Sequence, residues 1–163
     1  MAGVNLTVPW EARPSEDGYW ETYTAKTGVT IQRGSIVAYD ITNDTVIAAN
    51  ETDAGAVDPA ALVVIGVARS SIKTAAAAGA QLEVWEWGPD FDFQAANPVA
   101  ANVREVVWAA WAVDPKTVTL TQPAVNQLGI VGQIIRILKT GATGIVRVRT
   151  KFGGLLKTAI ELT

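Results

Sequence analysis

Short apolar runs, separated by polar segments and by turns that contain glycine or proline, recur from about residue 30 onward. Apolar and polar positions alternate with a period of two over 81–87 (QLEVWEW) and 145–150 (IVRVRT). This period is typical of half-buried strands, and a sustained helical period is hard to find. The pattern predicts an all-β chain, folded as a small β-sandwich or a β-barrel-like domain.

The expected strands are bounded by turn-forming residues, among them Asn43-Asp44, Gly88-Pro89 and Asp114-Pro115. We expect strands over 34–41, 45–49, 61–65, 81–87, 103–108, 116–120, 130–138 and 145–150, with a last edge strand over 155–162.

A weak internal repeat supports this organisation. Residues 65–85 match 128–147 when one residue is omitted. Both segments contain an apolar–Gly–apolar start, a connection, a Gly-Ala pair and an alternating strand. Many β-hairpins share such features, so we infer only that one strand–loop–strand unit recurs.

The first 28 residues differ from the rest because they are polar and show no sustained period. They nevertheless contain four aromatic residues, which is unusual for a disordered tail: Trp10, Tyr19, Trp20 and Tyr23. We expect an extended N-terminal arm over 1–28, followed by a β-rich domain over 29–163. The aromatic residues anchor the arm either on a partner or on its own domain.

Composition narrows the possible chemistry. The 163 residues are 49% hydrophobic and 18% charged, which favours a packed core over intrinsic disorder. The chain has no cysteine and no histidine, which excludes disulfides and the catalytic or zinc sites that need those residues. Phosphate-binding glycine loops and the serine elbow motif are also absent. We therefore expect no enzymatic activity, no cofactor and no metal site.

Asp90 and Asp92, in the segment GPDFDF, are the best-placed pair of acids. In an extended segment their side chains share one face, where two carboxylates could serve hydrolysis or bind calcium. The segment supplies neither further oxygen ligands nor a turn glycine at the spacing of a calcium loop. The sequence favours a solvated turn here.

Charge is distributed unevenly along the chain, whose net charge is −3. Residues 1–60 have a net charge of −6, whereas residues 115–163 have a net charge of +6. The acidic N-terminal segment and the basic C-terminal segment are therefore complementary in charge and attract each other within one subunit or between neighbouring subunits. The alternative is that these charges only form solvated faces. The acidic balance disfavours specific nucleic-acid binding. No apolar run approaches the ~20 residues of a membrane span, and no signal peptide is recognisable, so we expect the protein in the cytoplasm of the cell that makes it, with no membrane partner.

Two strands have unusual outer faces. Trp85 and Trp87 share one face of 81–87 with Glu83, and they fill the core, contact a neighbouring subunit or stack on sugar rings. Arg147, Arg149 and Lys151 form a basic stripe opposite apolar residues. This stripe protects a sheet edge, faces solvent, meets an acidic partner or contacts phosphate.

The order of these elements resembles that of bacteriophage head decoration proteins, also called capsid cement proteins. The likeness covers roughly residues 30–150. It rests on GSIVAYDI, IGVARSS and TAAAAGAQLEVWEWG, and on the later segment VREVVWAAWAVDPKTVTLTQPAVNQLGIVGQIIRILKTGATGIVRVR.

The resemblance implies a non-enzymatic virion protein on the capsid exterior, which binds the major capsid protein and stabilises the assembled head, often as a trimer. The alternatives are another virion part, such as a tail tube, head fibre or minor capsid protein, and a carbohydrate-binding module. For a capsid or subunit interface we expect Trp10, Tyr19, Trp20, Tyr23, Trp85, Trp87, Arg147, Arg149 and Lys151.

Overall fold

The computed structural model describes residues 18–49, 62–99, 109–121 and 129–150. These residues contain strands and no helix, so the all-β prediction is confirmed. The strands are β1 (Tyr19–Thr24), β2 (Ile36–Asp40), β3 (Thr45–Ala48), β4 (Leu62–Ala68), β5 (Gln81–Trp87), β6 (Asp90–Ala95), β7 (Ala109–Asp114), β8 (Thr117–Thr119), β9 (Ile130–Lys139) and β10 (Ile145–Arg149).

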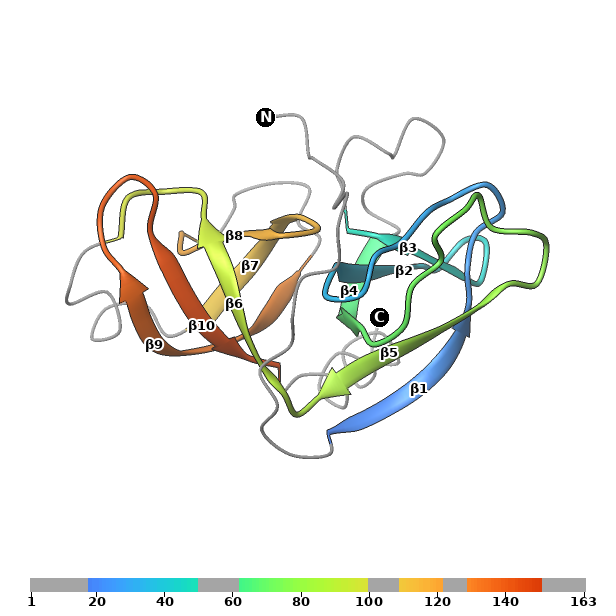
Figure 1. Cartoon of the computed structure of the whole chain (residues 1–163), viewed down its shortest axis with the longest axis horizontal. Helices are drawn as coiled ribbons and strands as arrows, with labels where there is room; N and C mark the ends of the chain where they lie inside the picture. The colour runs from blue at the N-terminus through green and yellow to red at the C-terminus, as the bar shows by residue number, and fades with distance from the viewer. Residues whose placement is uncertain (1–17, 50–61, 100–108, 122–128, 151–163) are drawn as a thin grey trace.

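The strands form two five-stranded units that lie side by side (Figure 1). In the first unit the sheet order is β1-β5-β4-β2-β3. The second unit is a closed barrel with the order β10-β6-β8-β7-β9. The chain passes from β5 into β6 through Gly88-Pro89, which ends one strand and starts the next in a new direction.

The two units have the same topology. When β6 to β10 replace β1 to β5 in order, each antiparallel strand pair of the first unit has an antiparallel counterpart in the barrel. The parallel contact of β6 with β8 corresponds to a single parallel bridge between Ala25, just after β1, and Val46 in β3. Isolated bridges join equivalent loops as well, Ile31 to Ile72 and Val99 to Gly141. The expected strand–loop–strand repeat, here β4–β5 and β9–β10, thus belongs to a larger repeat of whole units.

Two glycines mark equivalent close contacts in these units. A Cβ atom on Gly66 of β4 would lie 2.0 Å from the carbonyl oxygen of Trp85 in β5. A Cβ atom on Gly132 of β9 would lie 2.1 Å from the carbonyl oxygen of Arg149 in β10. Only glycine therefore allows the fourth strand of each unit to approach the fifth this closely.

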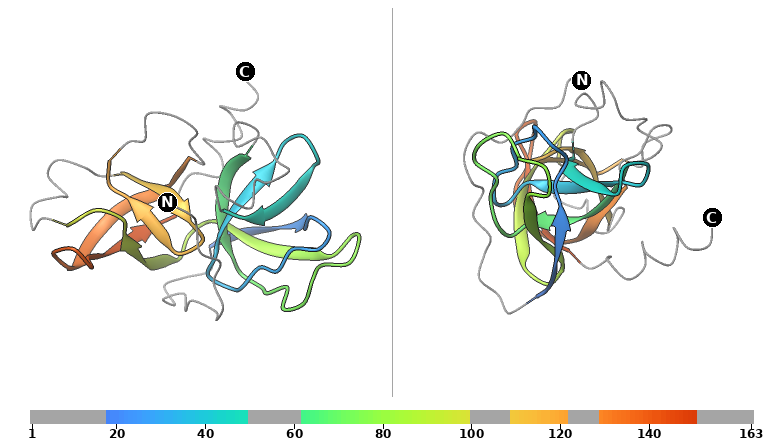
Figure 2. Two further views of the ribbon diagram at one scale, coloured as in Figure 1. Left: turned by 90° about the horizontal axis from the view of Figure 1, so that it is seen from above. Right: turned by 90° about the vertical axis from the view of Figure 1, so that its right-hand side faces the viewer.

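The core has two parts. The smaller lies inside the first unit and includes Ile31, Val46 and Leu82. The larger fills the barrel, around Phe91 and Phe93, and continues onto the outer face of the first unit. That face supplies Ile36, Ala38, Ile47, Ala49, Leu62, Val64 and Val67. The two units are consequently joined by a common apolar core. Figure 2 shows, in the view from above, the strands of the two units next to each other.

The structure corrects two of the sequence-based assignments and adds one strand that was not expected. The arm expected over 1–28 extends too far, because Tyr19–Thr24 forms β1 and pairs along its length with β5. The segment after Pro89 is a strand rather than a solvated turn. The structure has a strand at Ala109–Asp114, whereas the expected strand at 103–108 lies outside the described residues, as does the one at 155–162.

Candidate binding surfaces

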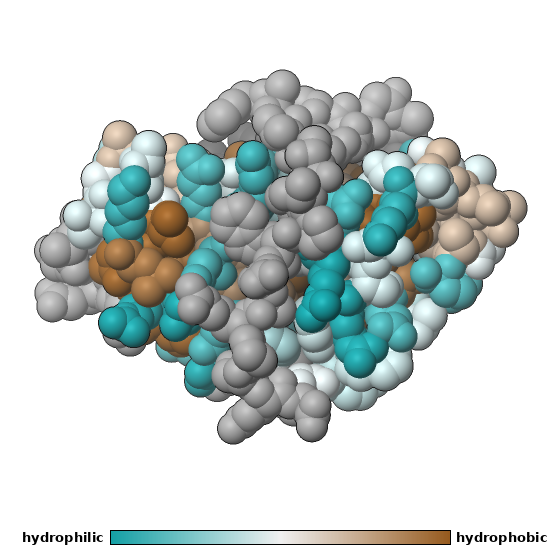
Figure 3. All heavy atoms as spheres, viewed as in Figure 1, coloured by the Kyte–Doolittle hydropathy of each residue, from teal (hydrophilic) through white to brown (hydrophobic). Residues whose placement is uncertain are grey.

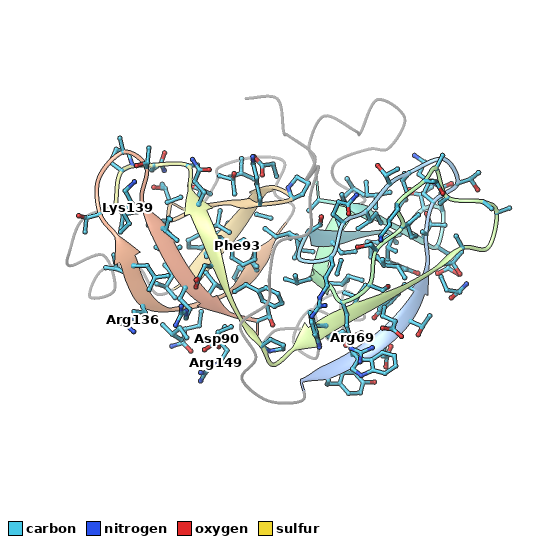
Figure 4. All side chains as sticks on the ribbon, viewed as in Figure 1. Arg69, Asp90, Phe93, Arg136, Lys139 and Arg149 are labelled. Carbon is cyan, nitrogen blue, oxygen red and sulfur yellow. The ribbon has the colours of Figure 1, made fainter. Side chains whose placement is uncertain are left out.

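The most exposed aromatic residues that the structure describes are on β1. Tyr19 is 43% exposed and Trp20 is 41% exposed. The Arg69 guanidinium lies over the Trp20 ring, 4.3 Å from its centroid, and pairs with Glu83 of β5. We call Tyr19, Trp20, Arg69 and Glu83 the β1–β5 surface. Figure 4 labels Arg69 at this edge of the first unit.

Trp85 is opposite Trp20 in the sheet but has a different environment. It is half-buried, packs against the larger core, and its ring centroid lies 5.6 Å from that of Phe91 at the start of the barrel. The exposed Arg33 covers it, 5.7 Å from the ring centroid. Trp85 therefore joins the two units. The backbone of Trp87 lies in β5, but its side chain is outside the described part of the structure.

Tyr23 faces the inside of the first unit rather than the β1–β5 surface. It packs against the smaller core, and its hydroxyl donates a hydrogen bond to the carboxylate of buried Glu86. Burial, together with this carboxylate, raises the pKa of Tyr23 well above its ordinary value. These contacts place Tyr23 in the core and do not make it a surface anchor.

The two arginines of the basic stripe that lie on β10 are paired within the chain. Arg147 and Arg149 stand directly opposite Asp92 and Asp90 of β6. In each pair the arginine Nε and one terminal nitrogen donate to the two carboxylate oxygens, at 2.7 and 3.2 Å for Arg147 and 2.8 and 3.1 Å for Arg149. Such two-point pairing is among the strongest charge-assisted arrangements.

This ion pairing changes the interpretation of the arginines on β10 and of the aspartates on β6. The hydrogen bond to Asp92 raises the pKa of Arg147 further above its ordinary value. Asp92 and Asp90 act as counter-charges to Arg147 and Arg149. Figure 4 shows Asp90 and Arg149 together at one end of the barrel. The sequence predicted an alternating strand for the arginines and favoured a solvated turn for the aspartates, and it did not show that β6 and β10 are neighbours.

Trp10 and Lys151 lie outside the described residues. Within the described ranges, no group of three or more acidic, histidine or cysteine residues could hold a metal ion. The same ranges contain no helix long and apolar enough to cross a membrane. Comparison with protein-family models, with curated proteins and with solved structures gives no match.

Proposed function

We propose that this chain is a non-enzymatic structural protein of a bacteriophage virion. It binds the major capsid protein on the outside of the assembled head, as a homotrimer, and stabilises the shell. The resemblance of residues 30–150 to head decoration proteins supports this role. The observation that carries it is the β1–β5 surface, where Tyr19 and Trp20 are exposed next to each other and Arg69 lies over the Trp20 ring.

The composition of this surface suits protein recognition. Tryptophan, tyrosine and arginine dominate the energetics of protein interfaces. Because Arg69 is already fixed between Trp20 and Glu83, little side-chain entropy is lost when a partner covers the surface. A trimer would present three such surfaces, and simultaneous attachment raises avidity well above the affinity of one.

The test is binding to assembled capsids that lack the protein, measured by co-sedimentation over a range of concentrations. We expect Trp20→Ala to weaken binding by about tenfold or more, on the scale of an interface hot spot. Thr22→Ala is the matched control, because Thr22 is exposed on the same strand and face. Equal binding by both variants contradicts the role of this surface, and assembly into tubes without capsids favours a tail protein.

Carbohydrate binding is a second candidate because Trp20 is exposed on a strand. A sugar ring would stack on the face of Trp20 that Arg69 does not cover. Quenching of tryptophan emission by simple glycans, lost in Trp20→Ala and kept in Thr22→Ala, would support this candidate over capsid binding.

A further inference from the structure

A second surface, on the barrel, has the composition of an interface. Figure 3 shows apolar atoms gathered on the outside of the barrel, with polar atoms around them. Leu138 of β9 is 38% exposed, and Ile135 and Ile145 are partly exposed. Arg136 and Lys139 alternate with these residues and are exposed. We call these five residues the β9 patch.

Two β-bulges place the aliphatic residues of β9 on the outside. Ile145 and Val146 of β10 are opposite Lys139 and Ile137, so Leu138 between them has no partner. The same happens at Ile135, which falls between the partners of Arg147 and Val148. Bulges break the inward–outward alternation of a strand and redirect side chains. Here they expose two large aliphatic residues while Ile134 and Ile137 still pack against the core.

The rim of the patch is positively charged. Arg136 and Lys139 have no ion pair among the described residues, in contrast to Arg147 and Arg149 on the next strand. An apolar centre with a cationic rim fits a partner surface that offers an apolar side chain beside a carboxylate.

The turn between β2 and β3 offers this combination. Ile41 is 45% exposed, and Asp44 is exposed three residues later, where it accepts a hydrogen bond from Tyr39. This turn and the β9–β10 hairpin lie at opposite ends of the long axis of the molecule (Figures 1 and 2). They therefore meet only between two copies.

We propose that the β9 patch binds the β2–β3 turn of a second copy, with Ile41 against Leu138 and Asp44 facing Arg136. The contact is head to tail, so repeated association closes into a ring when the rotation between copies allows it. This inference deepens the proposed homo-oligomeric role and rests on it. The contact would also bring a residue of the acidic segment 1–60, Asp44, against a residue of the basic segment 115–163, Arg136.

A mixing experiment with full-length chains tests the head-to-tail geometry. Ile41→Ser removes the apolar group of the turn, and Leu138→Ser removes the centre of the patch. We expect the native chain to form an oligomer in solution and each variant to be monomeric. An equal mixture should contain a dimer of twice 17.2 kDa and nothing larger, because one intact turn meets one intact patch. A monomeric native chain, two unaffected variants or a mixture without the dimer overturns the proposal.

A charge cycle provides an independent measurement if a serine variant fails to fold. Asp44→Asn and Arg136→Gln should each raise the dissociation constant by about threefold to tenfold. If the two side chains pair directly, the dissociation constant of the double variant should not exceed that of the weaker-binding single variant. Lys73→Gln is the control, because Lys73 is exposed outside both surfaces. Additive effects of the two substitutions exclude direct pairing. Because none of these measurements includes capsids, a failure here is distinguishable from a failure of Trp20→Ala to alter capsid binding.

Discussion

The Arg147–Asp92 pair of the barrel and the Arg69–Glu83 pair of the first unit differ in burial, and this difference decides what each contributes. The side chains of Arg147 and Asp92 are 19% and 15% exposed, whereas those of Arg69 and Glu83 are 36% and 37% exposed. In the second barrel pair the Asp90 side chain is 11% exposed and that of Arg149 is 42% exposed. Removing one member of a largely buried pair leaves an uncompensated charge, whereas water replaces the partner at an exposed pair. The same residue types therefore support folding in the barrel and remain available for binding on the β1–β5 surface.

We predict that Asp92→Ala lowers the free energy of unfolding by roughly 2 kcal/mol. Glu83→Ala, at the exposed pair, should cost less than about 1 kcal/mol. Urea unfolding followed by tryptophan fluorescence measures both. Equal losses would show that burial does not separate the two pairs. Charge reversal at Arg147 and Arg149 would place four acidic side chains on two adjacent strands, β6 and β10. If that variant binds capsids less well, loss of folding is the first explanation to test.

Alkaline pH should destabilise the chain through its tyrosines. The hydrogen bond to Asp44 raises the pKa of Tyr39 from 10.0 to about 12, and burial also raises the pKa of Tyr23. A folded-state pKa above the unfolded one means that the folded chain holds the proton more tightly. This stability is fully present below pH 10.0 and is lost as pH rises toward about 12. Unfolding midpoints measured across this window should fall less steeply for Tyr23→Phe than for the native chain.

At the scale of elements, the equivalence of the two units predicts equivalent sensitivity at Gly66 and Gly132. Alanine at either position should cost at least about 3 kcal/mol, because the added Cβ would overlap backbone atoms that cannot move away independently. Gly79→Ala is the control. Gly79 has a positive φ of 78° but open space around it, so only the backbone strain of about 1 kcal/mol applies. A small loss at either core glycine, in thermal or urea unfolding, contradicts the close strand contact.

The N-terminal boundary gives a second element-scale prediction. Removal of residues 1–17 deletes none of the described strands, whereas removal of residues 1–24 also deletes β1, which covers β5 and contributes Tyr23 to the core. We expect the shorter deletion to keep the native unfolding midpoint and the longer one to lower it markedly. Equal midpoints would mean that β1 adds little to the fold. Capsid binding by the shorter deletion then measures what residues 1–17 contribute.

Local alternation made several strands predictable. The expected strand at 81–87 coincides with β5, and those at 34–41 and 45–49 contain β2 and β3, because each has apolar residues on a repeating face. β1 was missed because its sequence, YWETYT, has no two-residue alternation of apolar and polar positions. β6 was missed because two aspartates in a short segment indicate a solvated turn. The arginines that neutralise them, Arg149 and Arg147, come from a strand that is distant in the sequence. Pairings between distant strands depend on topology, which single-sequence periods do not contain. The candidate site was affected in the same way, since Arg69 was not predicted to lie over Trp20.

At the scale of the whole molecule, the shared core should make the two units unfold together. The outer face of the first unit is buried against the barrel, and Trp85 packs on Phe91 across the junction. Separation of the units would expose this apolar face, which costs roughly 25 cal/mol per Å². We therefore expect one thermal transition, and a monomeric variant such as Leu138→Ser should show equal calorimetric and van't Hoff enthalpies because dissociation does not contribute to its unfolding. Trp85→Ala should destabilise the whole chain by about 3 kcal/mol, whereas Trp20→Ala, on the exposed surface, should cost less than about 1 kcal/mol. Two separate transitions in the native chain would mean that each unit folds by itself and that the junction contributes little.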